Sequence, residues 1–414
     1  MQLHSGRLFW PTLYDKPQQY PVLSESLRCD VLIIGGGLSG CLLAYMLSKT
    51  GMNVTLLEKH KAGSGSSGAN TGLIQYTSDK TLTSCINSFG EEKGVRFYQL
   101  CREAVHGLTR FYKETGGMEE GMALRSSLYF ASTLDDKPML QEEYETLRKY
   151  GFSAAWLSEQ EIARRFPFSK PGAIYTSGDA EINPYHFVHV LLQAAARNGV
   201  KVYEDSPAAG FHFDGRHVRC RVGEHEVTAD RVVIATGYET QEMKKDRGAY
   251  LTQSFALATE PVQFLDQWYQ RCLIWESARP YLYLRTTSDN RIIIGGRDES
   301  IGPGGLDETR YLSQCDNLLQ ELAELFPMAA GLKAEFAWGA VFGQTHDGLP
   351  YIGEHPRFPG CLFMEGYGGN GAVYSYIASK LIMDVLKGHS RRDLELFSLV
   401  RTAHGQQPLL TDYD

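Results

Sequence analysis

The chain has 414 residues, of which 43% are hydrophobic and 22% are charged, and its formal net charge is −8. These values are typical of a soluble globular protein of roughly two to three domains, and they argue against disorder and against nucleic acid as a partner. The eight cysteines show no CxxC spacing, so neither a metal site nor a disulfide framework is expected. With no apolar run long enough for a membrane span, we predict a cytoplasmic protein.

The N-terminal part of the chain predicts an arm followed by a βαβ unit. Residues 1–27 are rich in Pro, Tyr and Gln without a sustained period, which indicates an arm over the surface of the body. Residues 29–34 predict a strand buried on both faces, residues 40–50 a helix, and residues 54–57 a second strand. Such a unit, of about 30 residues, begins an α/β domain.

A glycine motif connects the first strand to its helix. Gly35, Gly37 and Gly40 fit the pattern GxGxxG, whose glycines permit a tight turn, close approach of the backbone to a pyrophosphate, and close packing of helix on strand. Glu58 ends the second strand, where a carboxylate accepts hydrogen bonds from ribose hydroxyls and disfavours a 2′-phosphate. These residues predict a site for FAD or NAD, and the alternative is a plain glycine-rich turn.

The next segment, residues 63–73 (GSGSSGANTGL), is too long and too polar for a simple strand-to-helix connection. Its small residues offer many hydrogen-bond donors and let a ligand approach the backbone closely. We interpret it as a ligand-binding loop, and the alternative is a flexible surface loop.

The rest of the chain alternates predicted helices and strands. Helices are expected at 89–115, 137–150, 158–165 (with a capping box from Ser158 and Glu161), 184–198, 310–325 and 370–387. Strands are expected at 121–132, 200–203, 217–222, 226–234, 250–264, 281–296 (as a hairpin) and from 337 onward. Tyr281, Tyr283 and Arg285 alternate on one face of the hairpin.

Several segments together resemble one known family. The GxGxxG motif, Glu58 and the loop residues 66–72 (SSGANTG) resemble the FAD-binding half of the D-amino-acid-oxidase and glycine-oxidase superfamily, in the style of its γ-glutamylputrescine-oxidase-like and sarcosine-oxidase-like members. Residues 230–238 (DRVVIATGY), 338–353 and 366–371 (GYGGNG) resemble later segments of the same family. The resemblance extends over nearly the whole chain beyond the arm and is weakest at 85–180.

This resemblance implies the fold class and the division into domains. It implies an α/β protein with a Rossmann-like FAD-binding domain and a second, α+β substrate domain built on a mixed or antiparallel sheet. The FAD-binding domain is expected to comprise residues 28–84, 150–245 and 335–414. The substrate domain is expected to comprise residues 85–149 and 246–334.

The resemblance also implies which residues contact FAD. The expected contacts are Gly35, Gly37, Leu38, Ser39, Gly40, Glu58, Lys59, Ser66, Ser67, Asn70, Thr71, Gly72, Leu73, Ala208, Ala235, Thr236, Gly237, Gly343, Gly368, Gly369, Asn370 and Gly371. Amides at 369–371, placed at a helix N-terminus, are expected to stabilise negative charge on the reduced flavin. Asn370, Tyr283 and Arg285 are therefore the candidate catalytic residues.

The chain departs from the family at three positions. Covalently flavinylated members have a cysteine where this chain has Ala340, and no histidine lies in the 63–73 loop, so we expect FAD to be bound non-covalently. Relatives place an arginine or a lysine for the substrate carboxylate where this chain has Phe342 and Val373. An apolar side chain cannot pair with a desolvated carboxylate, so Arg285 remains as the cation for a distal acid group of the substrate. The alternative for Arg285 is a surface ion pair.

The expected reaction follows from the family. A small-molecule amine is oxidised by hydride transfer from its α-carbon to flavin N5, the imine hydrolyses, and dioxygen or an electron carrier reoxidises the flavin. Two alternatives stay open: an FAD-dependent dehydrogenase of a hydroxy compound, because the 66–73 loop also resembles that class, and a flavin-bound protein without turnover.

Overall fold

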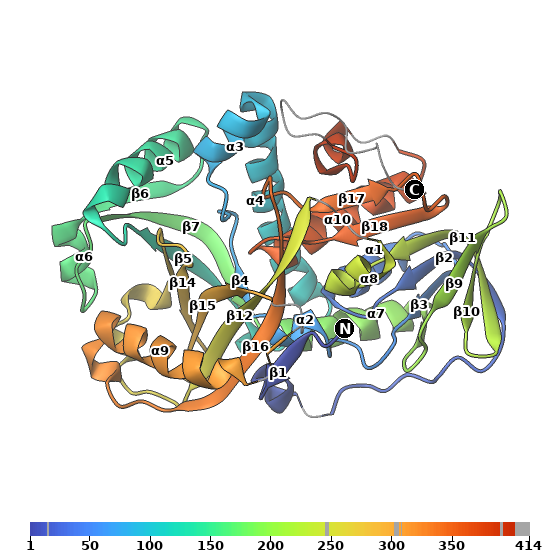
Figure 1. The fold of residues 1–414 in the computed structure, drawn as a ribbon, viewed down its shortest axis with the longest axis horizontal. Coiled ribbons are helices and arrows are strands. Elements are labelled where there is room, and N and C mark those ends of the chain that lie inside the picture. Colours follow the sequence, from blue (N-terminus) through green and yellow to red (C-terminus); the bar gives the residue numbers. More distant parts are fainter. Residues whose placement is uncertain (15, 245–247, 302–305, 308, 390–391, 402–414) are drawn as a thin grey trace.

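The computed structural model describes residues 1–14, 16–244, 248–301, 306–307, 309–389 and 392–401. Its strands form one sheet of 10 strands and one of 8 strands, and helices cover both (Figure 1). This mixed α/β architecture confirms the predicted fold class. Among the described residues, no helix combines the length and the apolar character that crossing a membrane requires.

The smaller sheet is largely parallel. Its strand order is β17-β18-β11-β2-β3-β8, with β2 at Leu27–Ile34, β3 at Val54–Leu57, β8 at Lys201–Tyr203, β11 at His225–Ile234, β17 at Tyr351–Glu354 and β18 at Cys361–Glu365. Only β17 runs antiparallel to its neighbour in this row, and the hairpin of β9 (Ala209–Phe213) and β10 (Val218–Val222) extends from β11. Helices pack on one face of this sheet and the hairpin of β9 and β10 packs on the other, so the end of β2 is buried on both sides, as its unbroken apolar run predicts.

Four helices pack on each other at one face of the smaller sheet, which α1 and α10 contact directly. They are α1 (Leu38–Leu47), α4 (Glu91–Glu114), α7 (Pro184–Arg197) and α10 (Gly371–Leu386). The α1 helix contacts both α7 and α10, which leaves it almost no exposed face. Its sequence accordingly has no polar stripe, because a helix that is buried all round is apolar all round.

The larger sheet is mainly antiparallel. Its order is β1-β16-β12-β15-β14-β13-β5-β7-β4, with β1 at His4–Gly6, β4 at Leu73–Ile74, β5 at Met122–Phe130, β7 at Gly172–Ile182, β12 at Ala249–Thr259, β13 at Leu273–Glu276, β14 at Leu282–Thr286, β15 at Ile292–Ser300 and β16 at Ala334–Thr345. The strand β6 (Ala154–Ser158) pairs with β7, and the pair of β13 and β5 is parallel. This is the mixed sheet that the sequence predicts for the second domain.

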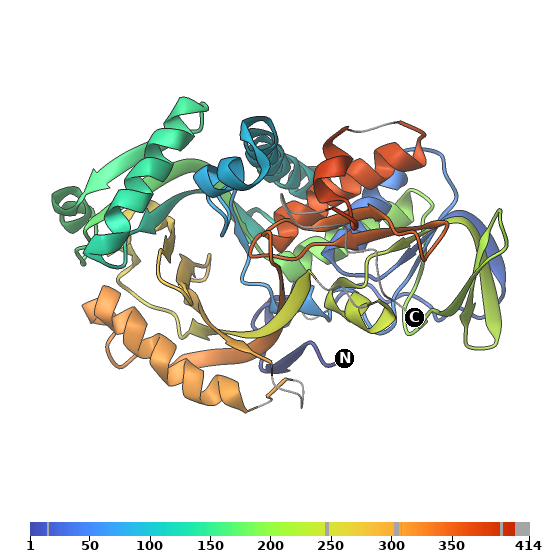
Figure 2. The ribbon, with the colours of Figure 1, turned by 45° about the horizontal axis from the view of Figure 1, so that its top comes forward.

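The larger sheet has its own covering helices. The helix α9 (Arg310–Leu325) packs against β16, β12 and β15, and Figure 2 shows it along the outer side of this sheet. The helices α5 (Lys137–Lys149) and α6 (Glu159–Arg165) lie beside β6 and β7, while α3 (Leu82–Phe89) packs on α4. The predicted capping box at the start of α6 is confirmed, since Ser158 accepts from the Glu161 amide and the Glu161 carboxylate accepts from the Ser158 amide.

Strand membership differs from the predicted segments in three places. The strands β6, β7 and β16 belong to the larger sheet, although residues 150–182 and 335–345 were assigned to the FAD-binding side. The arm also contributes a strand, because β1 pairs with β16, and Phe9 and Trp10 are only 1% and 2% exposed. The reason is pairing between strands that are distant in the sequence. The strand β7 pairs with β5, and β1 pairs with β16, and no local sequence pattern reveals such pairing.

Candidate active site

A cavity of about 840 Å³ lies where the two sheets meet. Ile34, Leu57 and Ile234, at the carboxyl ends of three parallel strands, line it on one side, and residues of β12, β14, β15 and β16 line it on the other. Ligands of open α/β sheets bind outside the carboxyl ends of the strands, and the volume falls within the roughly 300–1,000 Å³ common for small-molecule sites.

The turn between β2 and α1 can be made only with glycine. Gly35 has a φ of +113°, and a Cβ there would lie 2.4 Å from the Ala235 carbonyl oxygen. A Cβ at Gly40 would lie 1.9 Å from the Gly35 oxygen. The glycines therefore bring the first turn of α1 up to the cavity wall, where a helix N-terminus favours a pyrophosphate.

Glu58 is fixed at the end of β3 by main-chain amides. Its carboxylate accepts hydrogen bonds from the Gly36 and His60 amides, each at 2.7 Å. Burial raises the pKa of Glu58, and these two hydrogen bonds, which favour the ionised form, oppose the rise. The carboxylate is thus positioned in the cavity wall before any ligand binds. Its neighbour Lys59 forms an ion pair with Glu239 at 2.8 Å.

The loop 63–73 is tied down by two tryptophans. The indole N–H of Trp10 donates to the Asn70 carbonyl at 2.6 Å, and that of Trp338 donates to the Ala69 carbonyl at 2.9 Å. Ser67 Oγ accepts from the Leu38 amide at 2.9 Å, which links the loop to α1. Ser66 also lines the cavity, and its buried Oγ has no partner among the described residues, as expected of a hydroxyl whose partner is a bound ligand. The loop and the glycine turn therefore fit a dinucleotide.

Most of the predicted cofactor-binding residues line this cavity. Those that do are Gly35, Gly37, Leu38, Ser39, Glu58, Lys59, Ser66, Ser67, Asn70, Thr71, Leu73, Ala208, Ala235, Thr236, Gly237, Gly369, Asn370 and Gly371. Gly40, Gly72, Gly343 and Gly368 do not. Gly343 acts one layer back, because a Cβ there would lie 2.4 Å from Tyr367 and 2.6 Å from Tyr238, and both of these stacked rings line the cavity.

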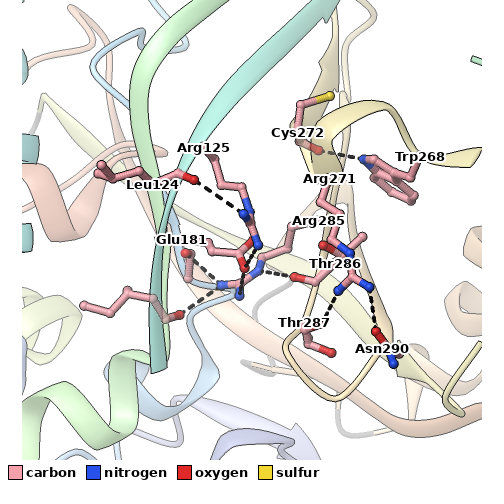
Figure 3. A network of polar contacts seen from close by, with 12 residues as sticks. Leu124, Arg125, Glu181, Trp268, Arg271, Cys272, Arg285, Thr286, Thr287 and Asn290 are labelled. Atoms are coloured by element: carbon pink, nitrogen blue, oxygen red, sulfur yellow. Dashed lines mark hydrogen bonds and ion pairs between the residues drawn. The ribbon is translucent and has the colours of Figure 1, made fainter. Parts of the chain in front are cut away.

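The candidate catalytic residue Arg285 does not line the cavity, and its proposed role as a substrate anchor is wrong for this structure. Arg285 is 3% exposed, and its Nη1 donates to the Gly72 and Ile182 carbonyls, both at 2.9 Å. Its Nη2 lies 3.6 Å from Glu181, which also binds Arg125 (Figure 3). The guanidinium thus fastens the ligand-binding loop to β7 and is buried away from the cavity.

Asn370 lines the cavity at the start of α10, but its side chain is also engaged. Its amide nitrogen donates to the carbonyls of Gln75 and Thr77, at 3.1 and 2.6 Å. The neighbouring Gly369 amide, expected to face the flavin, donates instead to Asp79 Oδ2 at 3.0 Å. Asn370 therefore joins α10 to residues 75–79, and its catalytic role stays a prediction.

The end of the cavity against the larger sheet is lined by Tyr281 and Tyr283, which the sequence placed on one face of a hairpin. Trp275, Asp79 and Asp298, which the sequence did not single out, line it as well. Phe342 and Ala340 also line it, whereas Val373 is 1% exposed and lies outside the wall. Neither acid belongs to a recognisable motif, so only the fold brings them together.

Comparison with known proteins agrees with this geometry. The chain is 27% identical over 390 residues to glycine oxidase of Geobacillus kaustophilus, covering 90% of this chain and 97% of that protein. It is 25% identical over 389 residues to gamma-glutamylputrescine oxidoreductase of Escherichia coli, covering 91% of this chain and 88% of that protein. The crystal structure of the G. kaustophilus glycine oxidase superposes with a TM-score of 0.76 at 25% identity, covering 91% and 99% of the two chains.

The model of one protein family matches almost the whole body of the chain, residues 30–385. This match includes the glycine turn, Glu58, the 63–73 loop and the start of α10. The chain therefore belongs to the DAO family of FAD dependent oxidoreductases.

Proposed function

We propose that this FAD-dependent oxidoreductase oxidises a C–N bond of an amine or amino-acid derivative. The observation that carries the proposal is the continuity of the cavity, which joins the glycine turn and Glu58 to an aromatic chamber walled by Trp275, Tyr281 and Tyr283. The names of the relatives, glycine oxidase and gamma-glutamylputrescine oxidoreductase, support an amine as the donor.

The residues present fit FAD along the whole length of the cavity. The start of α1 and the 63–73 loop would hold the pyrophosphate, and Glu58 would accept hydrogen bonds from the ribose. When bound, FAD supplies a two-electron acceptor that takes a hydride at N5. The start of α10, with the amides of Asn370 and Gly371, would lie beside the pyrimidine edge and stabilise negative charge there.

The chain's own contribution to the reaction is to orient the substrate. Trp275 is stacked on Tyr129 with ring centroids 3.7 Å apart, which fixes this wall of the chamber. Such a wall holds the carbon that loses hydride at a constant position, and positioning of this kind lowers the barrier substantially. Loss of a hydride from carbon and of a proton from nitrogen leaves an imine, which water hydrolyses to a carbonyl compound and free amine or ammonia.

A screen of the FAD-loaded protein tests the proposal. Amines and the matching alcohols are added without oxygen, and loss of the yellow flavin absorbance is followed. We expect bleaching by at least one amine, with formation of its carbonyl product and, in air, of hydrogen peroxide or of a reduced electron carrier. Bleaching by hydroxy compounds alone would support the alternative dehydrogenase, and bleaching by neither class would leave a flavin protein without turnover.

A further inference from the structure

The geometry points to the charge of the substrate: we propose that the chamber against the larger sheet binds a cation, so that the substrate is an amine with a second positive charge and no carboxylate. This inference rests on the proposed function and names the substrate class of the same site. It is carried by two carboxylates, three aromatic rings and one hydroxyl that line this part of the cavity.

The two carboxylates come from separate elements. Asp298 lies in β15, and Asp79 lies in the segment after β4 and accepts a hydrogen bond from the Gly369 amide at 3.0 Å. Both line the cavity and interact electrostatically with each other. Burial raises the pKa of Asp298 to about 6, and the proximity of Asp79 adds to the rise, because two neighbouring carboxylates repel each other. A cation between them would remove this repulsion.

The aromatic side chains around them suit a cation as well. Tyr281 and Tyr283 have ring centroids 5.8 Å apart and stand beside the buried Trp275. The faces of such rings carry negative charge and attract ammonium groups. The chamber therefore combines two carboxyl groups with three rings of the type that binds alkylammonium groups.

A hydroxyl in the same wall is still without a partner. Thr77 is 8% exposed, lines the cavity two residues before Asp79, and its Oγ1 forms no hydrogen bond within the described part of the chain. A buried hydroxyl without a partner costs free energy unless a ligand supplies one. An ammonium group, with three N–H donors, supplies a donor to this oxygen and others to the carboxylates.

The described cations near the chamber do not neutralise it. Arg279 is exposed and lies outside the wall, where it stacks over Tyr281 at 5.0 Å and donates to the Asp79 main-chain oxygen at 3.3 Å. Its charge lowers the pKa of both acids, against the larger effect of burial. Lys59 lines the cavity but is paired with Glu239 at the dinucleotide end. Two carboxylates thus face one solvated guanidinium, and a substrate carboxylate would be repelled.

A matched set of substrates tests the inference without any mutation. Butane-1,4-diamine, butylamine and 4-aminobutanoate have the same chain and differ only in the distal charge. We expect the second-order rate constant for anaerobic flavin bleaching to be at least 10-fold higher for the diamine than for butylamine, and lowest for 4-aminobutanoate. Equal values for the first two, or the highest value for 4-aminobutanoate, would overturn the inference and leave the proposed function standing. No bleaching by any amine would instead refute the proposed function.

Variants and an unreactive ligand provide the second test. The fully methylated dication of butane-1,4-diamine keeps both positive charges but cannot lose a proton from nitrogen, so its affinity, measured by calorimetry on FAD-loaded protein, reports the charge and ring contacts without the N–H donors. We expect Asp298→Asn and Asp79→Asn each to weaken it 10-fold or more, whereas Asp316→Asn, an exposed acid on α9, changes it less than 2-fold. Retained yellow colour shows that a variant is folded. Unchanged affinity in both chamber variants, or equal weakening in all three, contradicts a built cation site.

Discussion

At the scale of single residues, Glu58 shows how the chain prepares a ligand contact in advance. Its carboxylate is held by two amides, so binding FAD requires little reorganisation. We expect Glu58→Ala to weaken FAD binding about 10- to 100-fold, because a hydrogen bond to a charged group contributes about 1.5–3 kcal/mol. Titration of the apoprotein with FAD measures this. Glu145→Ala, an exposed acid on α5, is the matched control, and an unchanged dissociation constant in Glu58→Ala would refute the assigned contact.

Asp179 predicts a pH dependence of stability. It is fully buried, accepts hydrogen bonds from the Tyr76 amide and the Ser127 hydroxyl, and burial raises its pKa to about 6. Because its pKa is about 3.8 in the unfolded chain, the folded protein binds more protons between about pH 4 and 6, and the contribution of this group falls as the pH rises through that window.

The variant Asp179→Asn removes this titration. We therefore expect the free energy of unfolding of the wild type, relative to that of Asp179→Asn, to be about 2–3 kcal/mol smaller at pH 8 than at pH 4. Denaturant unfolding at the two pH values provides the comparison. A difference that is independent of pH would show that Asp179 does not titrate between them.

Arg285 is expected to act on stability. Replacing it with Met leaves the Gly72 and Ile182 carbonyls without this donor and Glu181 with one cation fewer, which we expect to cost about 3–5 kcal/mol. Arg219→Met, in an exposed ion pair with Asp214, should cost less than about 1 kcal/mol. Urea midpoints give both values, and a raised KM in Arg285→Met without loss of stability would restore the substrate role that the sequence suggested.

These residues show where sequence reasoning succeeds and where it ends. Glu58 was predictable because its position follows from one local unit of strand, turn, helix and strand. The role of Arg285 was misjudged because alternation along a strand predicts only the face on which a side chain lies. On that face Tyr281 and Tyr283 line the cavity, and Arg285 lies beyond its end. Asp79 and Asp298 were missed because an acid in a loop or a strand has no local signature of burial; they approach each other only when β15 joins the larger sheet.

At the scale of elements, the arm is part of the cofactor site. Trp10 is 2% exposed and its indole holds the carbonyl of Asn70. We expect Trp10→Ala to destabilise the protein by about 3–5 kcal/mol and to reduce FAD retention during dialysis. Leu13→Ala, three residues away and 41% exposed, should change stability by less than about 0.5 kcal/mol. Full FAD retention in Trp10→Ala would mean that the arm does not support the loop.

Element prediction was most accurate where the apolar pattern was strong. The strand β3 and the helix α9 have the predicted bounds, because β3 is a short, mainly apolar run, α9 has a clear helical period, and both have polar flanks. The strand β7 was not predicted, since its sequence GAIYTSGDAEI mixes polar residues and glycines with apolar ones. It is a strand because β5 and β6 pair with it on either side, and such tertiary context outweighs local preference.

At the scale of the whole molecule, the cavity wall predicts how FAD is attached. None of the eight cysteines lines it, and Ala340 stands at the position where the resemblance places the cysteine of covalently flavinylated members. We expect acid precipitation to release all of the flavin into the supernatant, where its absorbance equals that of the original holoprotein. Flavin that remains with the washed pellet would reveal a covalent bond, for which His4 and His60 are the cavity-lining imidazoles.

The pairing of the first strands with late ones also orders events on the ribosome. His4 in β1 pairs with Ala340 in β16, and Leu27 in β2 pairs with Val227 in β11. At roughly 5–20 residues per second, β1 waits about 20–70 s after its synthesis for its partner to emerge. During that time the nascent chain exposes apolar strand edges that attract chaperones and other unfolded chains. Because α10 follows β16, cofactor loading is confined to the last moments of translation or to the time after release.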